Sequence, residues 1–250
     1  MVNCMFEKLT RAVDWVLSRI FSSKFKCVCC GKDVFSDSEE YCTKCSMSIT
    51  RTKDRRTCIK CHRPIYGEGD YCMICTDYTH EFDVAYSVYT YSGTISKMIR
   101  NMKYSNKMYL APYFAKHLID KYADMPTCDI VVSVPPSMDR ARYRYHDHTK
   151  LLARAFSEGS GVEYIEGLLK RLKDTEPLEK KSPKQRREHL KGAFAISDRR
   201  AIKGKRVLLI DDVFTTGATA DECASVIKKM GALEVYILTI AVTEYKVKTI

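Results

Sequence analysis

Residues 207–219 (VLLIDDVFTTGAT) constrain the possible folds more than any other segment of the chain. Four apolar residues run directly into Asp211 and Asp212, which is typical of a buried parallel strand that ends at its carboxyl edge. A loop of small residues follows at 215–219, and residues 220–230 have a helical composition that ends at a glycine. The segment therefore predicts a strand, an acid pair, a tight loop and a helix within an α/β sheet.

This order of elements also predicts a binding site for the 5′-phosphate of a sugar. Ligands of open α/β sheets bind outside the carboxyl ends of the strands. A tight loop at a helix start offers backbone N–H groups and hydroxyls to a phosphate, and adjacent carboxylates can accept hydrogen bonds from vicinal hydroxyls such as those of ribose. The alternative is an ordinary buried strand followed by an N-cap threonine, with two solvated acids.

The pattern resembles the phosphoribosyl pyrophosphate (PRPP) motif of type I phosphoribosyltransferases. The resemblance implies that Asp211 and Asp212 are catalytic residues that face the ribose hydroxyls, with Mg²⁺ bound together with PRPP. It assigns the 5′-phosphate to Thr215, Thr216, Gly217, Ala218 and Thr219. Replacing both acids by asparagine is expected to abolish PRPP binding and to leave the melting temperature equal or higher, because acids at a strand end contact ligand and not the core.

Eight of the twelve cysteines form four C-x-x-C pairs ahead of this region. Two such pairs separated by a short loop suit a tetrahedral tetrathiolate zinc site of the ribbon kind. The loops are 11 and 10 residues long, and each unit has a basic residue after its first pair and a tyrosine before its second. This repeat predicts two structural zinc ions bound in order, with an interleaved pairing and redox chemistry as alternatives. The ligands are Cys27, Cys30, Cys42 and Cys45 in one unit and Cys58, Cys61, Cys72 and Cys75 in the other.

The chain of 250 residues suits one α/β domain with a small appendage. We predict an amphipathic helix in residues 1–26, a double zinc ribbon in 27–78 and the α/β domain in 79–250. The helix is expected to pack on its own protein, with a membrane surface as the alternative. No apolar run approaches the roughly 20 residues that span a bilayer, and the charged start lacks a signal-cleavage site. We expect a cytoplasmic protein, with the inner face of the membrane as the alternative location.

Charge is concentrated in one part of the chain. The net charge is +11, and residues 170–206 contain 14 Lys or Arg against 5 Asp or Glu. Such a block favours a polyanionic partner, either a nucleic acid or a phosphorylated small molecule. The alternative is a solvated surface segment.

The remaining pattern alternates strands with helices. Apolar runs predict strands at 82–91, 129–134 and 234–242, and helical spacing predicts helices at 94–103, 110–122 and 148–158. This alternation predicts a doubly wound parallel sheet. The loop after the second strand carries Arg140, Arg142 and Arg144, whose guanidinium groups suit bidentate contact with phosphate oxygens.

The zinc-ribbon start, the arginine-rich loop and the PRPP motif, in this order, resemble the ComF family (ComFC type) of phosphoribosyltransferase-fold proteins. The resemblance covers nearly the whole chain from Cys27 onward. Residues 99–104 (IRNMKY) match the family's Lys-aromatic segment, which implies that Lys103 lies near the site. Residues 144–148 (RYHDH) depart from the usual Arg-Gly-Phe-Asn-Gln, and residues 175–178 (TEPL) depart from the usual Thr-Pro-Pro-Gln.

The ComF resemblance implies a role in natural transformation, in which the protein helps to move incoming single-stranded DNA together with a DNA-uptake helicase. The alternative is a PRPP-dependent phosphoribosyltransferase with an unidentified acceptor, in which arginines stabilise the departing pyrophosphate. No segment of the sequence indicates which acceptor it would use.

Overall fold

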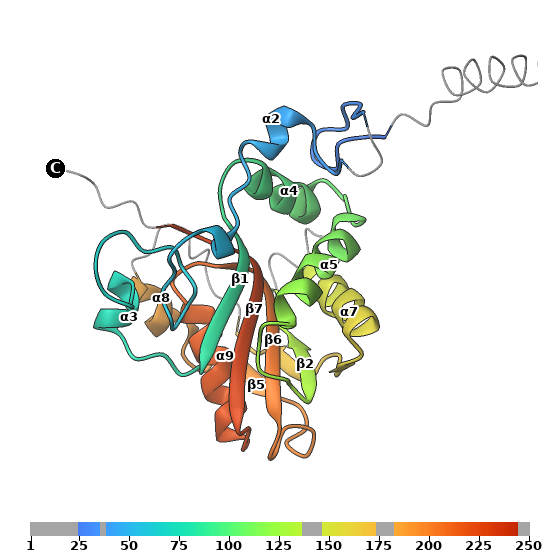
Figure 1. Ribbon diagram of the computed structural model, residues 1–250. Helices are drawn as coiled ribbons and strands as arrows, with labels where there is room; N and C mark the ends of the chain where they lie inside the picture. The colour runs from blue at the N-terminus through green and yellow to red at the C-terminus, as the bar shows by residue number, and fades with distance from the viewer. Residues whose placement is uncertain (1–24, 36–38, 137–146, 174–182, 245–250) are drawn as a thin grey trace, which may run out of the picture. The chain divides into compact units, whose positions relative to one another are not determined.

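The computed structural model describes residues 25–35, 39–136, 147–173 and 183–244 (Figure 1). The predicted helix within residues 1–26 and the arginines at 140, 142 and 144 lie outside the described residues. The chain forms two compact units, which divide after Ser48. Within the described ranges, no helix is both long enough and apolar enough to cross a bilayer.

The larger unit is built on a sheet of five parallel strands in the order β1-β7-β6-β2-β3. The strands are β1 (Val84–Thr90), β2 (Ile130–Ser133), β3 (Glu163–Tyr164), β6 (Arg206–Phe214) and β7 (Glu234–Val242). Central strand β6 pairs with β7 on one side and β2 on the other, with Ile210 opposite both Leu238 and Ser133. Helices cover both faces of this strand, which explains its continuous apolar run.

Helices lie on both faces of the sheet, with α5 and α7 on one face and α9 on the other (Figure 1). The longer described helices of this unit are α4 (Gly93–Tyr104), α5 (Leu110–Tyr122), α7 (His148–Ser160), α8 (Pro183–Leu190) and α9 (Ala218–Lys229). Local signals set the ends of α7: the Asp147 carboxylate accepts from the Lys150 N–H at 3.1 Å, and Gly161 closes the helix with φ of +77°. The predicted doubly wound parallel sheet is confirmed.

The structure adds elements that the apolar pattern does not indicate. An antiparallel hairpin pairs β4 (Leu169–Arg171) with β5 (Phe194–Ile196), and α8 lies between them in the chain. Strands of two or three residues are too short for a periodicity to appear. Helix α9 also begins two residues earlier than predicted, because its first turn includes the last part of the loop.

The two cysteine units have the same local structure. In each, a backbone hydrogen bond of 2.8 Å closes the first pair, from Gly31 N–H to Cys27 O and from His62 N–H to Cys58 O. A one-turn helix then carries the second pair: α2 (Thr43–Ser46) in the first unit and α3 (Met73–Asp77) in the second. A short 3₁₀ turn, η1 (Thr52–Asp54), lies in the chain between the two cysteine units. The internal repeat in the sequence is therefore a structural repeat.

The second cysteine unit shares a hydrophobic core with the sheet. Cys58, Cys61 and Cys72 are buried in one cluster with Phe82 of the following segment and Ile237 of β7. The compact units divide after Ser48, whereas the predicted ribbon boundary lies after residue 78. The second cysteine unit belongs to the larger compact unit because its buried cysteines are part of the core of the sheet.

Candidate functional site

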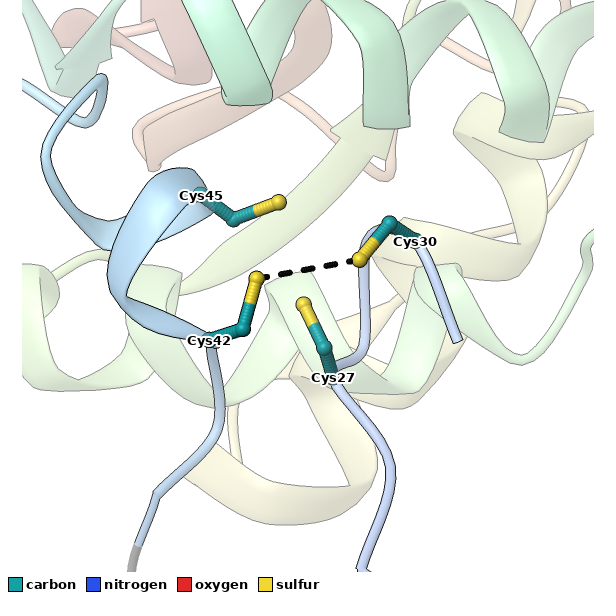
Figure 2. Close-up of side chains that lie close together, drawn as sticks. All are labelled: Cys27, Cys30, Cys42 and Cys45. Carbon is teal, nitrogen blue, oxygen red and sulfur yellow. Dashed lines mark hydrogen bonds between the residues drawn. The ribbon is translucent and has the colours of Figure 1, made fainter. Parts of the chain in front are cut away.

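Two groups of four thiols have the geometry of zinc sites. Within each group the four Sγ atoms lie within 4.8 Å of one another, and in the first group they point toward a common centre (Figure 2). The Sγ atoms of Cys30 and Cys42 are 3.8 Å apart, and those of Cys61 and Cys72 are 3.6 Å apart. A tetrahedral site with Zn–S bonds of about 2.3 Å requires sulfur separations of about 3.8 Å. The groups therefore fit zinc.

The grouping also settles the pairing of the cysteines. Cys27, Cys30, Cys42 and Cys45 form one group, and Cys58, Cys61, Cys72 and Cys75 form the other. The predicted in-order arrangement is confirmed, and the interleaved alternative is excluded. All eight are free thiols, at separations far beyond the roughly 2.05 Å of a disulfide. Four thiolates fill a tetrahedral shell, so a zinc ion here has a structural role.

We expect the protein to contain two zinc ions, and the Cys58→Ser variant to contain one. Loss of the second zinc ion in Cys58→Ser should lower the melting temperature more than loss of the first zinc ion in Cys27→Ser. The reason is that Cys58 is packed in the core of the larger unit. Metal analysis of reductively purified protein and thermal unfolding provide the measurements. Loss of both metals from Cys58→Ser, or equal melting temperatures in the two variants, would contradict this expectation.

The predicted phosphate loop joins β6 to α9 in a conformation that requires glycine. Gly217 lies just before α9 with φ of +84°. A Cβ atom at this position would lie 3.0 Å from both His80 Cε1 and Phe214 Cζ. The first N–H groups of α9 have no acceptor within the helix, and the helix dipole adds partial positive charge there. This end of α9 is therefore suited to an anion.

Four of the sequence-predicted residues line one small, open hollow at the carboxyl edge of the sheet: Asp211, Thr215, Gly217 and Thr219. The other two residues of the loop contribute differently. Thr216 and Ala218 are buried and are not among the residues that line the hollow. The Thr216 hydroxyl accepts from the Ala218 N–H at 3.4 Å, which tightens the turn.

The two acids of the motif face opposite sides of β6, because successive side chains of a strand alternate. Asp211 faces the hollow on the α9 side. Asp212 contacts residues of two other helices: Lys103 Nζ of α4 donates to its Oδ1 at 2.6 Å, and His148 Nε2 of α7 hydrogen-bonds its Oδ2. All three side chains of this cluster are largely buried. Lys103 thus lies at the site, with its ammonium hydrogen-bonded to Asp212.

The two carboxyl groups have different pKa values because their environments differ. Burial, and then the negative charge of Asp212, raise the pKa of Asp211 to about 7. Burial also works against ionisation of Asp212, but the Lys103 ammonium and the hydrogen bond to His148 outweigh it and lower the pKa of Asp212. At neutral pH the pair therefore carries one firm negative charge on Asp212 and a second, titrating one on Asp211.

His148 is a site residue that the sequence analysis did not identify. It occupies the last position of residues 144–148, where the chain departs from the usual family pattern. The N-cap at Asp147 starts α7 at this point, so His148 lies in the first turn of a helix that packs on β6. A polar residue at the start of a helix that packs on the acid-bearing strand is the only signal the sequence offers.

A second buried cluster lies behind the loop. His80 Nδ1 is 2.8 Å from a carboxylate oxygen of Asp221, in the first turn of α9, and the Glu81 N–H donates to the same carboxylate at 3.0 Å. The Arg187 guanidinium stacks on the Tyr78 ring, with its carbon 3.3 Å from the ring centroid. The segment after the second cysteine unit thus contacts the first turn of α9.

Comparison with known proteins agrees with this geometry. Residues 151–248 match the family model described as phosphoribosyl transferase domain. The chain is 24% identical to Competence protein F of Haemophilus influenzae, over 87% of this chain and 96% of that protein. It is 25% identical to DNA utilization protein YhgH of Escherichia coli K12, over 78% and 87%. It is 26% identical to Competence protein ComFC of Streptococcus pneumoniae, over 84% of each. The chain is thus similar over most of its length to ComF-type competence proteins, and its larger unit has the phosphoribosyltransferase fold.

Proposed function

We propose that this protein binds PRPP, or another sugar 5-phosphate, in the hollow at the carboxyl edge of the sheet. The observation that carries the proposal is that Asp211 and the Thr215–Thr219 turn line one space at the start of α9. The 5′-phosphate would accept hydrogen bonds from the loop N–H groups and hydroxyls. The Asp211 carboxylate would accept from a ribose hydroxyl, and Mg²⁺ would enter with the pyrophosphate.

Asp212 requires a different role from the one its neighbour has. Both of its carboxylate oxygens already have partners, Lys103 and His148. A ribose hydroxyl that donates to Asp212 must therefore share the carboxylate with these groups. We propose that Lys103 and His148 hold Asp212 ionised and fixed, so that Asp212 contacts the sugar through the lone pairs that remain.

We further propose that the protein handles incoming single-stranded DNA during natural transformation, together with a DNA-uptake helicase. Support comes from relatives named competence proteins and a DNA utilization protein, and from the excess of positive charge in residues 170–206. Lys and Arg side chains bind the phosphate backbone without sequence preference. The arginines at 140, 142 and 144 would extend this basic surface or contact pyrophosphate.

A phosphoribosyltransferase is the second candidate. The observation that favours it is the separated charge states of the two acids, an arrangement that active sites use to assign different roles to two carboxylates. Asp211 would then act near neutral pH, where it titrates. Release of pyrophosphate from PRPP in the presence of candidate acceptors would support this alternative over a binding role.

Calorimetric titration of PRPP, with and without Mg²⁺ and repeated with a short single-stranded DNA, tests the proposal. We expect PRPP to bind, and Mg²⁺ to strengthen the binding. Competition between PRPP and DNA would place both ligands in one site, whereas independent binding would place the DNA elsewhere. Absence of PRPP binding to the wild-type protein would show that the proposed function is wrong.

PRPP affinity should rise with pH between about 6 and 8. Asp211, with its raised pKa of about 7, must be ionised to accept from ribose, and its ionised fraction rises about tenfold over this range. The Asp211→Asn variant is the control, because it retains only the titration of the ligand. If PRPP affinity changes with pH in the same way in both proteins, Asp211 does not titrate in this range.

The same raised pKa predicts the opposite trend for stability without ligand. The unfolded carboxyl ionises near pH 3.9, well below the pKa of about 7 in the folded protein. The contribution of Asp211 to stability is therefore full below about pH 4 and is lost as pH rises through 7. The melting temperature of Asp211→Asn should exceed that of the wild type more at pH 8 than at pH 5.

A further inference from the structure

We propose that the second zinc site is coupled to the phosphate loop, and that Arg63 is the positioning residue that connects them. Arg63 follows the zinc-ligating Cys61 by two residues and reaches the loop from behind. The inference rests on the proposed function in one respect: the loop ligand is taken to be the 5′-phosphate of PRPP.

The Arg63 side chain joins three parts of the protein. The residue is only 2% exposed, and its Nη2 donates to the backbone carbonyl of Thr215, the first residue of the phosphate loop. Its Nη1 donates to the carbonyl of Thr243, just after β7, and lies 3.1 Å from the Thr243 hydroxyl. One rigid guanidinium therefore fixes the loop relative to the end of the neighbouring strand.

The zinc-binding turn sets the position of Arg63. The Cys58 N–H donates to the Arg63 carbonyl at 2.8 Å, and the His62 N–H donates to the Cys58 carbonyl at 2.8 Å. His62 adopts φ of +49°, a left-handed conformation that the closed turn requires. The backbone that carries Arg63 is thus part of the turn that presents Cys58 and Cys61 to the metal. Loss of the metal would remove a second constraint on this turn, in addition to its backbone hydrogen bonds.

Peptide geometry converts the Arg63 contact into an effect on the ligand site. In a trans peptide the C=O of one residue and the N–H of the next point in opposite directions. Arg63 lies outside the set of described residues that line the hollow, whereas Thr215 lines it. The Thr215 carbonyl points toward Arg63, so the Thr216 N–H points away from Arg63. A phosphate oxygen would accept from this N–H on the side of the loop opposite Arg63.

The segment after the last zinc ligand supports the loop at further points. His80 Cε1 lies 3.0 Å from the position that a Cβ of Gly217 would take, so the imidazole is in contact with the turn itself. The His80–Asp221 contact fixes the first turn of α9. Phe82 packs edge-on against Phe214, with ring centroids 5.7 Å apart. The second cysteine unit and the segment that follows it thus pack against the phosphate loop.

Coupling between two sites acts in both directions. If zinc fixes the loop through Arg63, zinc at the second site strengthens PRPP binding, and bound PRPP strengthens zinc binding at that site by the same factor. The first zinc site lies in the other compact unit.

The first experiment compares Arg63→Met with Arg56→Met. Arg56 lies in the same cysteine unit, but its exposed guanidinium binds the carbonyls of Gly67 and Gly69 and not the loop. We expect PRPP affinity to fall about 10- to 100-fold in Arg63→Met, the effect of one misaligned hydrogen bond to a charged group, and to be unchanged in Arg56→Met. Both variants should contain two zinc ions. Equal PRPP affinity in Arg63→Met and the wild type would overturn the inference.

The second experiment keeps Arg63 in place, and so it remains decisive if Arg63→Met fails to fold. In Cys27→Ser the remaining zinc is at the second site, and equilibrium competition with a zinc-selective chelator measures its dissociation constant. PRPP should lower this dissociation constant at least fivefold, the lower end of typical coupling between sites. Adding Asp211→Asn and Asp212→Asn should remove the effect. An unchanged zinc affinity with PRPP bound would overturn the inference, whereas absence of PRPP binding to the wild type would overturn the proposed function.

Discussion

Replacing both Asp211 and Asp212 by asparagine should weaken PRPP binding by about two to four decades. Each carboxylate is expected to accept a hydrogen bond from ribose, and a hydrogen bond to a charged group contributes about 1.5–3 kcal/mol. Calorimetry on the double variant and on each single variant measures the loss. Asp198→Asn is the matched control, because Asp198 is exposed and accepts only from the Arg200 N–H. A double variant that binds PRPP as well as the wild type would show that the motif has been misread.

The single variants should differ in stability. From the sequence, both acids are expected to be free of packing, so that their removal leaves the melting temperature equal or higher. The contacts of Asp212 predict a lower melting temperature for this variant instead, because Asp212→Asn leaves the buried Lys103 ammonium without its anionic partner. Breaking such a pair costs about 3 kcal/mol or more. Asp211→Asn, in contrast, removes a charge that burial disfavours, so its melting temperature at neutral pH should rise.

The strands that carry the site could be predicted because they are buried on both faces. Strand β7 has the predicted bounds, Glu234–Val242, and β6 contains the whole predicted run of apolar residues and acids. A continuous apolar run is the expected pattern for a central parallel strand. The short strands β3, β4 and β5 have no such pattern, because two or three residues complete no period.

The contacts of the acids could not be predicted in the same way. Alternation along β6 already places Asp211 and Asp212 on opposite faces, and this inference was open from the sequence. The partners of Asp212 could not be inferred from the sequence, because Lys103 precedes Asp212 by 109 residues and His148 precedes it by 64. Only the packing of α4 and α7 brings these side chains to the strand. The charge state of each acid follows from these partners.

The cysteine units show the same division between local and distant information. The repeated spacing predicted which thiols share a metal, and this pairing is local in the chain. Arg63 appeared in the sequence only as one basic residue of a repeated pattern. Its contacts with the carbonyls of Thr215 and Thr243 span 152 and 180 residues. No spacing rule reports contacts over such distances, so the link between ribbon and loop is visible only in the folded chain.

Removing positive charge from the basic block should cause a comparably large loss of single-stranded DNA binding. The substitutions are Lys180→Gln, Lys181→Gln, Lys184→Gln and Arg186→Gln. Each phosphate neutralised on a single strand contributes about −0.7 to the slope of log K against log salt. Four losses should flatten the slope by about three units, and weaken binding at 0.1 M salt by about three decades.

Arg187 is left unchanged in this variant because the structure gives it another role. Its guanidinium stacks on the Tyr78 ring and lies 3.9 Å from the carboxylate of Asp221, so its removal would disturb the base of α9. The control carries the same four-charge loss at exposed positions elsewhere: Lys97→Gln, Arg100→Gln, Lys116→Gln and Lys229→Gln. Fluorescence anisotropy with labelled DNA from 50 to 500 mM salt should show a flattened slope for the block variant alone. Equal slopes in the two variants would mean that only the overall charge of +11 attracts DNA, and the block would then be an ordinary solvated surface.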